Sequence, residues 1–128
     1  MIAENTRDIN KGKIDIFGLF QDGNLIGEIH VAYVHSDERF AVRNKRVYLF
    51  AFRVHEDFQG KGYGQFLMNE VVSILSEKGY SEFTIGVEDD NEMAIHIYSK
   101  LGFTQLIGRI SEKYQGDSYE YGLYLRSL

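Results

Sequence analysis

The chain has 128 residues and a formal net charge of −5, which fits one folded domain spanning residues 1–128 and argues against broad binding to nucleic acid. It contains no cysteine, so disulfides, thiolate nucleophiles and cysteine-based metal sites are excluded. No apolar stretch reaches the roughly 18 residues that a membrane helix needs, and the polar N-terminus lacks the apolar core of a signal peptide. We therefore expect a cytoplasmic protein whose partners include neither nucleic acid nor membrane.

The first part of the chain is predicted to form a β-hairpin. Residues 1–12 show no clear period and are expected to be frayed. Residues 13–20 alternate in polarity and read as a strand, and residues 25–34 return as a second strand. The pair Asp22-Gly23 between them is a strong signal for a tight turn.

Residues 36–46 are mostly polar and are predicted to form a loop, which Phe40, Ala41 and Val42 could anchor to the rest of the domain. A strand–helix–strand unit is predicted next. Residues 47–54 are apolar on both faces, which is typical of a strand in the middle of a covered sheet. A helix is predicted over residues 63–78, and residues 80–88 alternate as a further strand. The two strands should be parallel. The inward stripe of the helix is expected to comprise Phe66, Leu67, Val71, Ile74 and Leu75.

The last part of the chain predicts a second helix followed by a hairpin. The helix should begin among the small polar residues at 89–92 and run to about Lys100. Residues 103–110 and 118–125 are predicted strands. The fold class is therefore a mixed α/β layer of about six strands with two main helices and a short N-terminal region. The inward stripe of the second helix is expected to comprise Ala94, Ile97, Tyr98 and Leu101.

Three glycines, Gly60, Gly62 and Gly64, lie at alternate positions between the apolar strand and the first helix. Glycine lets the backbone approach a ligand closely and permits positive φ, and the first N–H groups of a helix have no partner inside it. A phosphate or pyrophosphate can satisfy these groups. The turn could therefore hold the pyrophosphate of a nucleotide-like cofactor; the alternative is a tight turn that only needs glycine.

A second pattern begins at Asn91 and continues through Ala94 and Tyr98 to Gly102-Phe103. Asn91 and Tyr98 lie two turns apart on one helix face. An inward tyrosine by itself is more typical of a core residue with a satisfied hydroxyl.

The two patterns together resemble the GNAT superfamily of acetyl-coenzyme A-dependent N-acetyltransferases. That family's glycine signature, Gln/Arg-x-x-Gly-x-Gly/Ala, stands here as Gln59-Gly60-Lys61-Gly62-Tyr63-Gly64. Its later helix often reads Asn-x-x-Ala-x-x-x-Tyr-x-x-x-Gly-Phe, which matches the second pattern. The resemblance covers roughly residues 13–125 and implies a mostly antiparallel sheet with one parallel βαβ unit.

The resemblance also implies a role for each matched position. Backbone N–H groups of the glycine turn bind the coenzyme A pyrophosphate, and the backbone at 52–54 pairs with the pantetheine arm. The thioester lies in a V-shaped gap between that strand and residues 84–87, and a backbone N–H near Val54 is our candidate donor to the carbonyl oxygen. Asn91 hydrogen-bonds the pantetheine or pyrophosphate region, and Tyr98 protonates the departing thiolate or hydrogen-bonds the sulfur. The expected cofactor-binding residues are Phe52, Val54, Gln59, Gly60, Lys61, Gly62, Tyr63, Gly64, Asn91 and Tyr98.

The general base is not assigned by this comparison. Some members of the family carry a catalytic glutamate on the central strand, where Tyr48 stands here, and residues 47–54 contain no acid. Glu88 is one candidate, acting directly or through water. None of the four histidines lies at a sequence spacing from other potential ligands that is typical of a metal site, so no metal is expected. Further candidates, for which a surface or structural role is favoured, are His30, His55 and Glu56.

The expected activity is transfer of acetyl from acetyl-CoA to a primary amine of a small molecule, peptide or protein, by direct attack in a ternary complex. The alternative is a module that binds acetyl-CoA or coenzyme A as a sensor or scaffold without turnover. A P-loop hydrolase fits poorly, because Gly62 stands where that motif needs Ser or Thr. Residues 1–12 are too few for the elements that wall the acceptor pocket in this family, which leaves the pocket open or completed by a second subunit in a homodimer. Carboxylates that could attract a cationic amine, although such a run is usually a solvated face, are Glu56, Asp57, Glu88, Asp89, Asp90 and Glu92.

Overall fold

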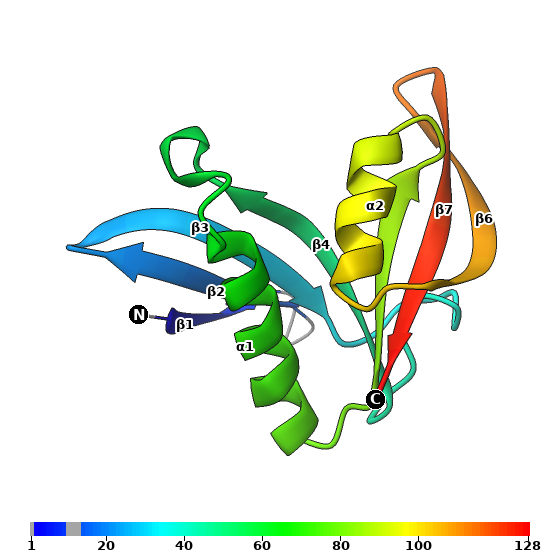
Figure 1. The fold of residues 1–128 in the computed structure, drawn as a ribbon. Coiled ribbons are helices and arrows are strands. Elements are labelled where there is room, and N and C mark those ends of the chain that lie inside the picture. The colour runs from blue at the N-terminus through cyan, green and yellow to red at the C-terminus, as the bar shows by residue number, and fades with distance from the viewer. Residues whose placement is uncertain (1, 10–13) are drawn as a thin grey trace.

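The computed structural model describes residues 2–9 and 14–128, which form one twisted sheet with two helices (Figure 1). Neighbouring strands follow the order β1-β2-β3-β4-β5-β7-β6, and among them only β4 and β5 are parallel. The helices are α1 (Tyr63–Glu77) and α2 (Glu92–Lys100), and a 3-10 turn spans Glu56–Phe58. The strands are β1 (Ile2–Ile9), β2 (Ile14–Gln21), β3 (Asn24–Ala32), β4 (Arg46–Val54), β5 (Glu82–Glu88), β6 (Gln105–Tyr114) and β7 (Asp117–Ser127).

The expected class, mixed and mostly antiparallel with one parallel βαβ unit, is confirmed, but the expectation of a frayed N-terminus is wrong for β1. This strand pairs with β2 in antiparallel fashion, with Ile2 opposite Leu19 and Asn5 opposite Ile16. Backbone hydrogen bonding to a neighbour can hold an edge strand that has no readable side-chain period. The sheet thus has one strand more than the six expected, while residues 1 and 10–13 lie outside the described residues.

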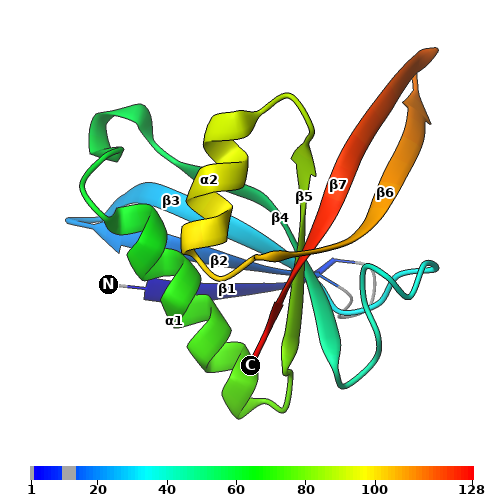
Figure 2. The same ribbon diagram turned by 45° about the vertical axis from the view of Figure 1, so that its right-hand side comes forward.

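Both helices pack on the same face of the sheet, as the view in Figure 2 makes clear. The stripe predicted for α1 is wrong at Phe66, which is 46% exposed. The helix buries adjacent pairs of residues, 67 with 68 and 71 with 72, so the centre of its buried face lies between the two members of each pair. Phe66 therefore lies at the edge of that face. Within the described chain, neither helix is long and apolar enough to cross a membrane. The side chains that α1 buries are Leu67, Met68, Val71, Val72 and Leu75.

A β-bulge in β4 separates this strand from β5. Glu28 pairs with Arg53 and His30 pairs with Phe50, so two residues of β4 lie opposite one residue of β3. Ala51, within the bulge, has φ 50°, which is uncommon for a residue with a side chain. Pairing between β4 and β5 ends at Leu49 opposite Ile85, and beyond this point the two strands diverge.

The loop between β3 and β4 covers part of the other face of the sheet. Phe40 is 2% exposed and packs against Ile110 and Leu123. The hydroxyl of Thr84 on β5 donates to the carbonyl oxygen of Phe40 at 2.7 Å. The predicted docking of this loop is therefore confirmed at Phe40, and Ala41 beside it is also buried.

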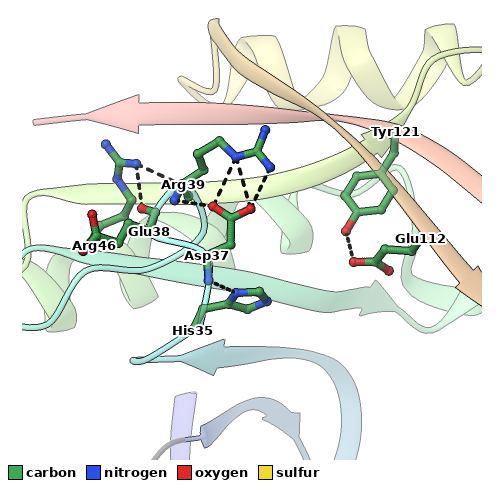
Figure 3. Close-up of polar contacts among 7 residues, drawn as sticks. All are labelled: His35, Asp37, Glu38, Arg39, Arg46, Glu112 and Tyr121. Atoms are coloured by element: carbon green, nitrogen blue, oxygen red, sulfur yellow. Dashed lines mark hydrogen bonds and ion pairs between the residues drawn. The ribbon is translucent and has the colours of Figure 1, made fainter.

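Polar contacts hold the same loop in shape (Figure 3). The Nδ1 of His35 accepts from the Asp37 N–H at 2.9 Å, and the Arg39 guanidinium donates to both carboxylate oxygens of Asp37. This hydrogen-bonded arginine lowers the pKa of Asp37 to about 2. Arg46 donates from Nη1 to the carbonyl oxygens of Glu38 and Arg39, at 3.1 Å each. These contacts thus fix the conformation of the loop where it covers the strands.

Candidate functional site

A cavity of about 500 Å³ lies on the helix face between the end of β4, the glycine turn and α2. Phe58 and Gln65 also line it, and neither was predicted as a site residue. Ala94 and Ile97 line it too; Ala94 packs against the core as predicted, but Ile97 is 47% exposed and forms part of the cavity wall instead. The predicted cofactor-binding residues that line it are Phe52, Val54, Gln59, Gly60, Gly62, Gly64 and Tyr98.

The glycine turn places the start of α1 at this cavity. Gly60 has φ 76° and Gly62 has φ 86°, and no described atom lies within 4 Å of where a Cβ would stand on either residue. Positive φ, rather than lack of space, therefore requires glycine at both positions. Gly62 is the N-cap of α1, and no side chain of the described residues caps this end. The first N–H groups of α1 remain available to an anion.

The end of β4 is tied to the turn and offers a further donor. Gln59 donates from Nε2 to the carbonyl oxygen of Val54 at 2.8 Å. The N–H of His55 donates to the carbonyl oxygen of Ile26 on β3 at 2.8 Å. Because backbone groups alternate in direction along an extended strand, the Val54 N–H points away from β3, toward the gap.

Two predicted cofactor-binding residues lie beside the cavity and not in its lining. The ammonium of Lys61 lies 5.8 Å from the ring centroid of Phe58, within the range of a cation–π contact. The hydroxyl of Tyr63 donates to Gln21 Oε1 at 3.2 Å, which joins α1 to β2. The Tyr63 hydroxyl is therefore engaged in a contact within the protein.

Tyr98 lies on α2 where the cavity meets the gap between β4 and β5. Its ring centroid is 6.1 Å from that of Phe52 and 6.2 Å from that of Phe103. Burial raises the pKa of the Tyr98 phenol above its usual 10.0, so the hydroxyl keeps its proton at neutral pH. Tyr98 and Phe52 also line a second cavity, of about 220 Å³, within the gap itself.

Asn91 is the N-cap of α2, as its sequence context predicts. Its Oδ1 accepts from the N–H of Ala94 at 3.1 Å. The side chain is not part of the lining of the 500 Å³ cavity. Only the amide NH₂ of Asn91 therefore remains for the predicted contact to a cofactor.

Two substitutions of Asn91 separate these roles. Asn91→Ala removes the cap and is expected to lower the free energy of unfolding by about 1 kcal/mol. Asn91→Asp keeps the accepting oxygen and should unfold like the wild type, but it removes the NH₂ donor. Urea titration measures the first effect and coenzyme A calorimetry the second. Equal stability of all three proteins would contradict the capping role.

The candidate bases lie away from the 500 Å³ cavity. Glu88, at the end of β5, instead lines a third cavity of about 240 Å³. His30 packs against Phe50, with 5.3 Å between ring centroids, and its Nε2 lies 3.7 Å from Glu28 Oε1. His55 is exposed, and its Nδ1 accepts from the N–H of Asp57.

Glu56 is also exposed and belongs to the 3-10 turn that follows β4. Among the side chains described, those of residues 14–128, no group of three or more His, Asp or Glu is placed to hold a metal ion.

Comparison with known proteins places these observations in a family context. A model of the Acetyltransferase (GNAT) family matches residues 3–103. Streptothricin acetyltransferase from Streptomyces lavendulae is 31% identical over 106 residues, which are 81% of this chain and 52% of that protein. Spermine/spermidine N(1)-acetyltransferase from Bacillus subtilis is 30% identical over 88 residues, 67% of this chain and 57% of that protein. The chain thus spans about half the length of each.

Solved structures share the fold as well. A GNAT family acetyltransferase from Elizabethkingia anophelis, solved with acetyl-CoA bound, superposes with a TM-score of 0.76 at 15% sequence identity. The superposition covers 100% of this chain and 97% of that chain.

Proposed function

This chain belongs to the acetyltransferase (GNAT) family, and we propose that it transfers acetyl from acetyl-CoA to a primary amine by direct attack in a ternary complex. One observation carries the proposal. The uncapped start of α1 at Gly62 and the phenol of Tyr98 line the same cavity of about 500 Å³. A candidate anion site and a candidate proton donor therefore border one space.

The residues of this cavity fit acetyl-CoA. The N–H groups that follow Gly62 suit a diphosphate, because they combine free donors with the positive end of a helix. The backbone at the end of β4, residues 52–54, suits an extended arm, and the walls formed by Phe52 and Ile97 are apolar. When bound, acetyl-CoA would supply the activated acetyl thioester. The related structure from Elizabethkingia anophelis contains this same ligand.

The chain's own residues then have distinct tasks. The Val54 N–H is our candidate for stabilising negative charge on the carbonyl oxygen, as a fixed donor does in acyl transfer. The Tyr98 hydroxyl, kept protonated by burial, gives its proton to the departing sulfur. Glu88, at the end of β5, is one candidate for taking a proton from the amine. Positioning of the two reactants supplies much of the remaining rate.

An acceptor panel tests the proposal against a sensor or scaffold that binds acetyl-CoA without turnover. We expect the purified chain to release thiol from acetyl-CoA only when an acceptor from a panel of amines, peptides and polyamines is added. Thiol release is followed with a chromogenic disulfide reagent, and calorimetry reports coenzyme A affinity in parallel. Binding without acceptor-dependent release would identify the sensor, and absence of binding would refute both functions.

A further inference from the structure

A cavity of about 240 Å³ lies on the sheet face opposite the helices, and of its lining residues only Glu88 has a role in the function proposed above. Five residues line it: Tyr48, Gly86, Glu88, Glu112 and Tyr121. They come from β4, β5, β6 and β7, so four strands meet around it. No lining residue is basic, and two carry carboxylates.

Cross-strand register explains why these side chains meet. Glu88 of β5 lies directly opposite Tyr121 of β7, and the Tyr121 hydroxyl donates to Glu112 Oε1 at 2.7 Å (Figure 3). A Cβ on Gly86 would stand 2.8 Å from the Tyr121 ring, so only glycine leaves room for that ring. Burial and the bond to Glu112 raise the pKa of Tyr121, which keeps the phenol a neutral donor. Tyr121 therefore engages one carboxylate oxygen of Glu112.

The covering loop fixes the remaining wall. Tyr48 stacks on Phe50 with 5.4 Å between ring centroids and meets Phe40 edge-on at 4.9 Å. Phe40 is in turn stacked on His35 at 4.2 Å. Tyr48 is thus held between its own strand and the loop and presents an ordered aromatic surface.

Shared walls place three cavities in a row through the sheet. Phe52 and Tyr98 line both the 500 Å³ cavity and the 220 Å³ gap. Tyr48 and Gly86 line both that gap and the 240 Å³ cavity. A thioester held beside Tyr98 would therefore face the carboxylates from across the gap that the β4 bulge opens.

A fourth cavity, of about 390 Å³, adjoins the third because Glu88 lines both. It is also bounded by Asp89, Asp90 and Glu120. Asp89 is paired with Arg109, which leaves the other carboxylates to act on a ligand. Negative charge therefore extends from the 240 Å³ cavity into this adjoining cavity.

We propose that the 240 Å³ cavity is the acceptor site and that it takes a small aliphatic diamine or polyamine. One ammonium group pairs with Glu112 between the rings of Tyr48 and Tyr121, and a second lies beyond Glu88 in the adjoining hollow. Carboxylates and aromatic faces are the groups that hold organic ammonium ions. This inference rests on the proposed acetyl transfer.

The proposal also assigns the proton transfers. Glu112, in place of the earlier candidate Glu88, takes one ammonium proton and passes it to water, which frees the nitrogen lone pair. The bond from nitrogen to the acetyl carbon forms, and the carbon–sulfur bond breaks. The sulfur takes a proton from Tyr98, and the proton then lost from the nitrogen returns to Tyr98 through water. One proton is released overall for each acetyl group transferred.

Putrescine and n-butylamine, which have equal carbon chains, are suitable probes. We expect kcat/KM to be about fivefold higher for putrescine, the effect of one additional ion pair at a solvated site. Glu112→Gln should raise the KM for putrescine about tenfold, because a charge-assisted contact at the reacting nitrogen is lost, and it should also lower kcat, because glutamine cannot accept the ammonium proton. Its coenzyme A affinity by calorimetry should match that of the wild type.

Asp117→Asn, at the tip of the same hairpin, is the matched control. It removes one negative charge but is not part of the cavity, so the KM for putrescine should not change. An unchanged KM in Glu112→Gln, an equal rise in Asp117→Asn, or no preference for putrescine would each overturn the inference while leaving acetyl transfer intact. If the wild type released no thiol with any amine, the proposed function itself would fall as well.

Discussion

Gly62→Val is expected to reduce coenzyme A affinity about a hundredfold while the protein remains folded. A β-branched residue avoids the left-handed conformation of Gly62, where φ is 86°, at a strain of about 1–2 kcal/mol. Relief of that strain would turn the first N–H groups of α1 away from the diphosphate. The new side chain would also project into the open space at this position. Isothermal titration calorimetry measures the affinity directly.

Gly23→Val separates backbone strain from loss of the anion site. Gly23, in the turn between β2 and β3, has φ 81° and no described atom within 4 Å of a Cβ position, so the strain should be similar. It is not part of the 500 Å³ cavity. The free energy of unfolding should fall by a similar amount in both variants, and the fall is small compared with the roughly 5–15 kcal/mol that stabilises a typical domain. Only Gly62→Val should lose affinity for coenzyme A. Wild-type affinity in Gly62→Val would refute the assignment of the turn.

Tyr98→Phe is expected to lower kcat about a hundredfold, toward the lower end of the range for a general acid. The ring and its packing on Phe52 and Phe103 are retained, so coenzyme A affinity should stay within about twofold of wild type. Because burial raises the pKa of Tyr98, wild-type turnover should show no loss from this group as pH rises through the neutral range. Steady-state thiol release across pH, together with calorimetry, measures both quantities.

Tyr124→Phe is the matched control for this change. Tyr124 is a partly buried tyrosine that packs on the same core and is not part of the cavity lining. Its loss of a hydroxyl should leave kcat unchanged. If Tyr98→Phe behaved in the same way, Tyr98 would have no part in proton transfer.

Most of the fold was predictable because each element carries a local signal. The Asp22-Gly23 turn between alternating segments predicts the hairpin of β2 and β3, and both residues indeed have positive φ. The glycine turn and the cap at Asn91 predict the starts of α1 and α2. Strand β1 was missed because its position depends on pairing with β2, and its own residues show no period to indicate this.

The candidate site was predictable on the helix face and much less so on the other face. Residues close together in the sequence, such as Gln59 and Gly62, meet through one local turn. Glu112 and Tyr121 meet Tyr48 only after four strands have come into register, and in the sequence they are ordinary residues of alternating strands. Ala51 gives no sign of its positive φ, because any small residue could stand there. The long-range pairing of these strands and the positive φ in the bulge of β4 could therefore be established only from the structure.

The additional residue in the bulge also sets the phase of everything that follows it in β4. Before it, Tyr48 and Phe50 face the acceptor side; after it, Phe52 and Val54 approach Gly64 on the helix side. If Ala51 instead took a regular place in the strand, every later side chain of β4 would change face, turning Phe52 outward and Arg53 inward. The bulge therefore lets one strand present its earlier even-numbered residues to one face of the sheet and its later ones to the other.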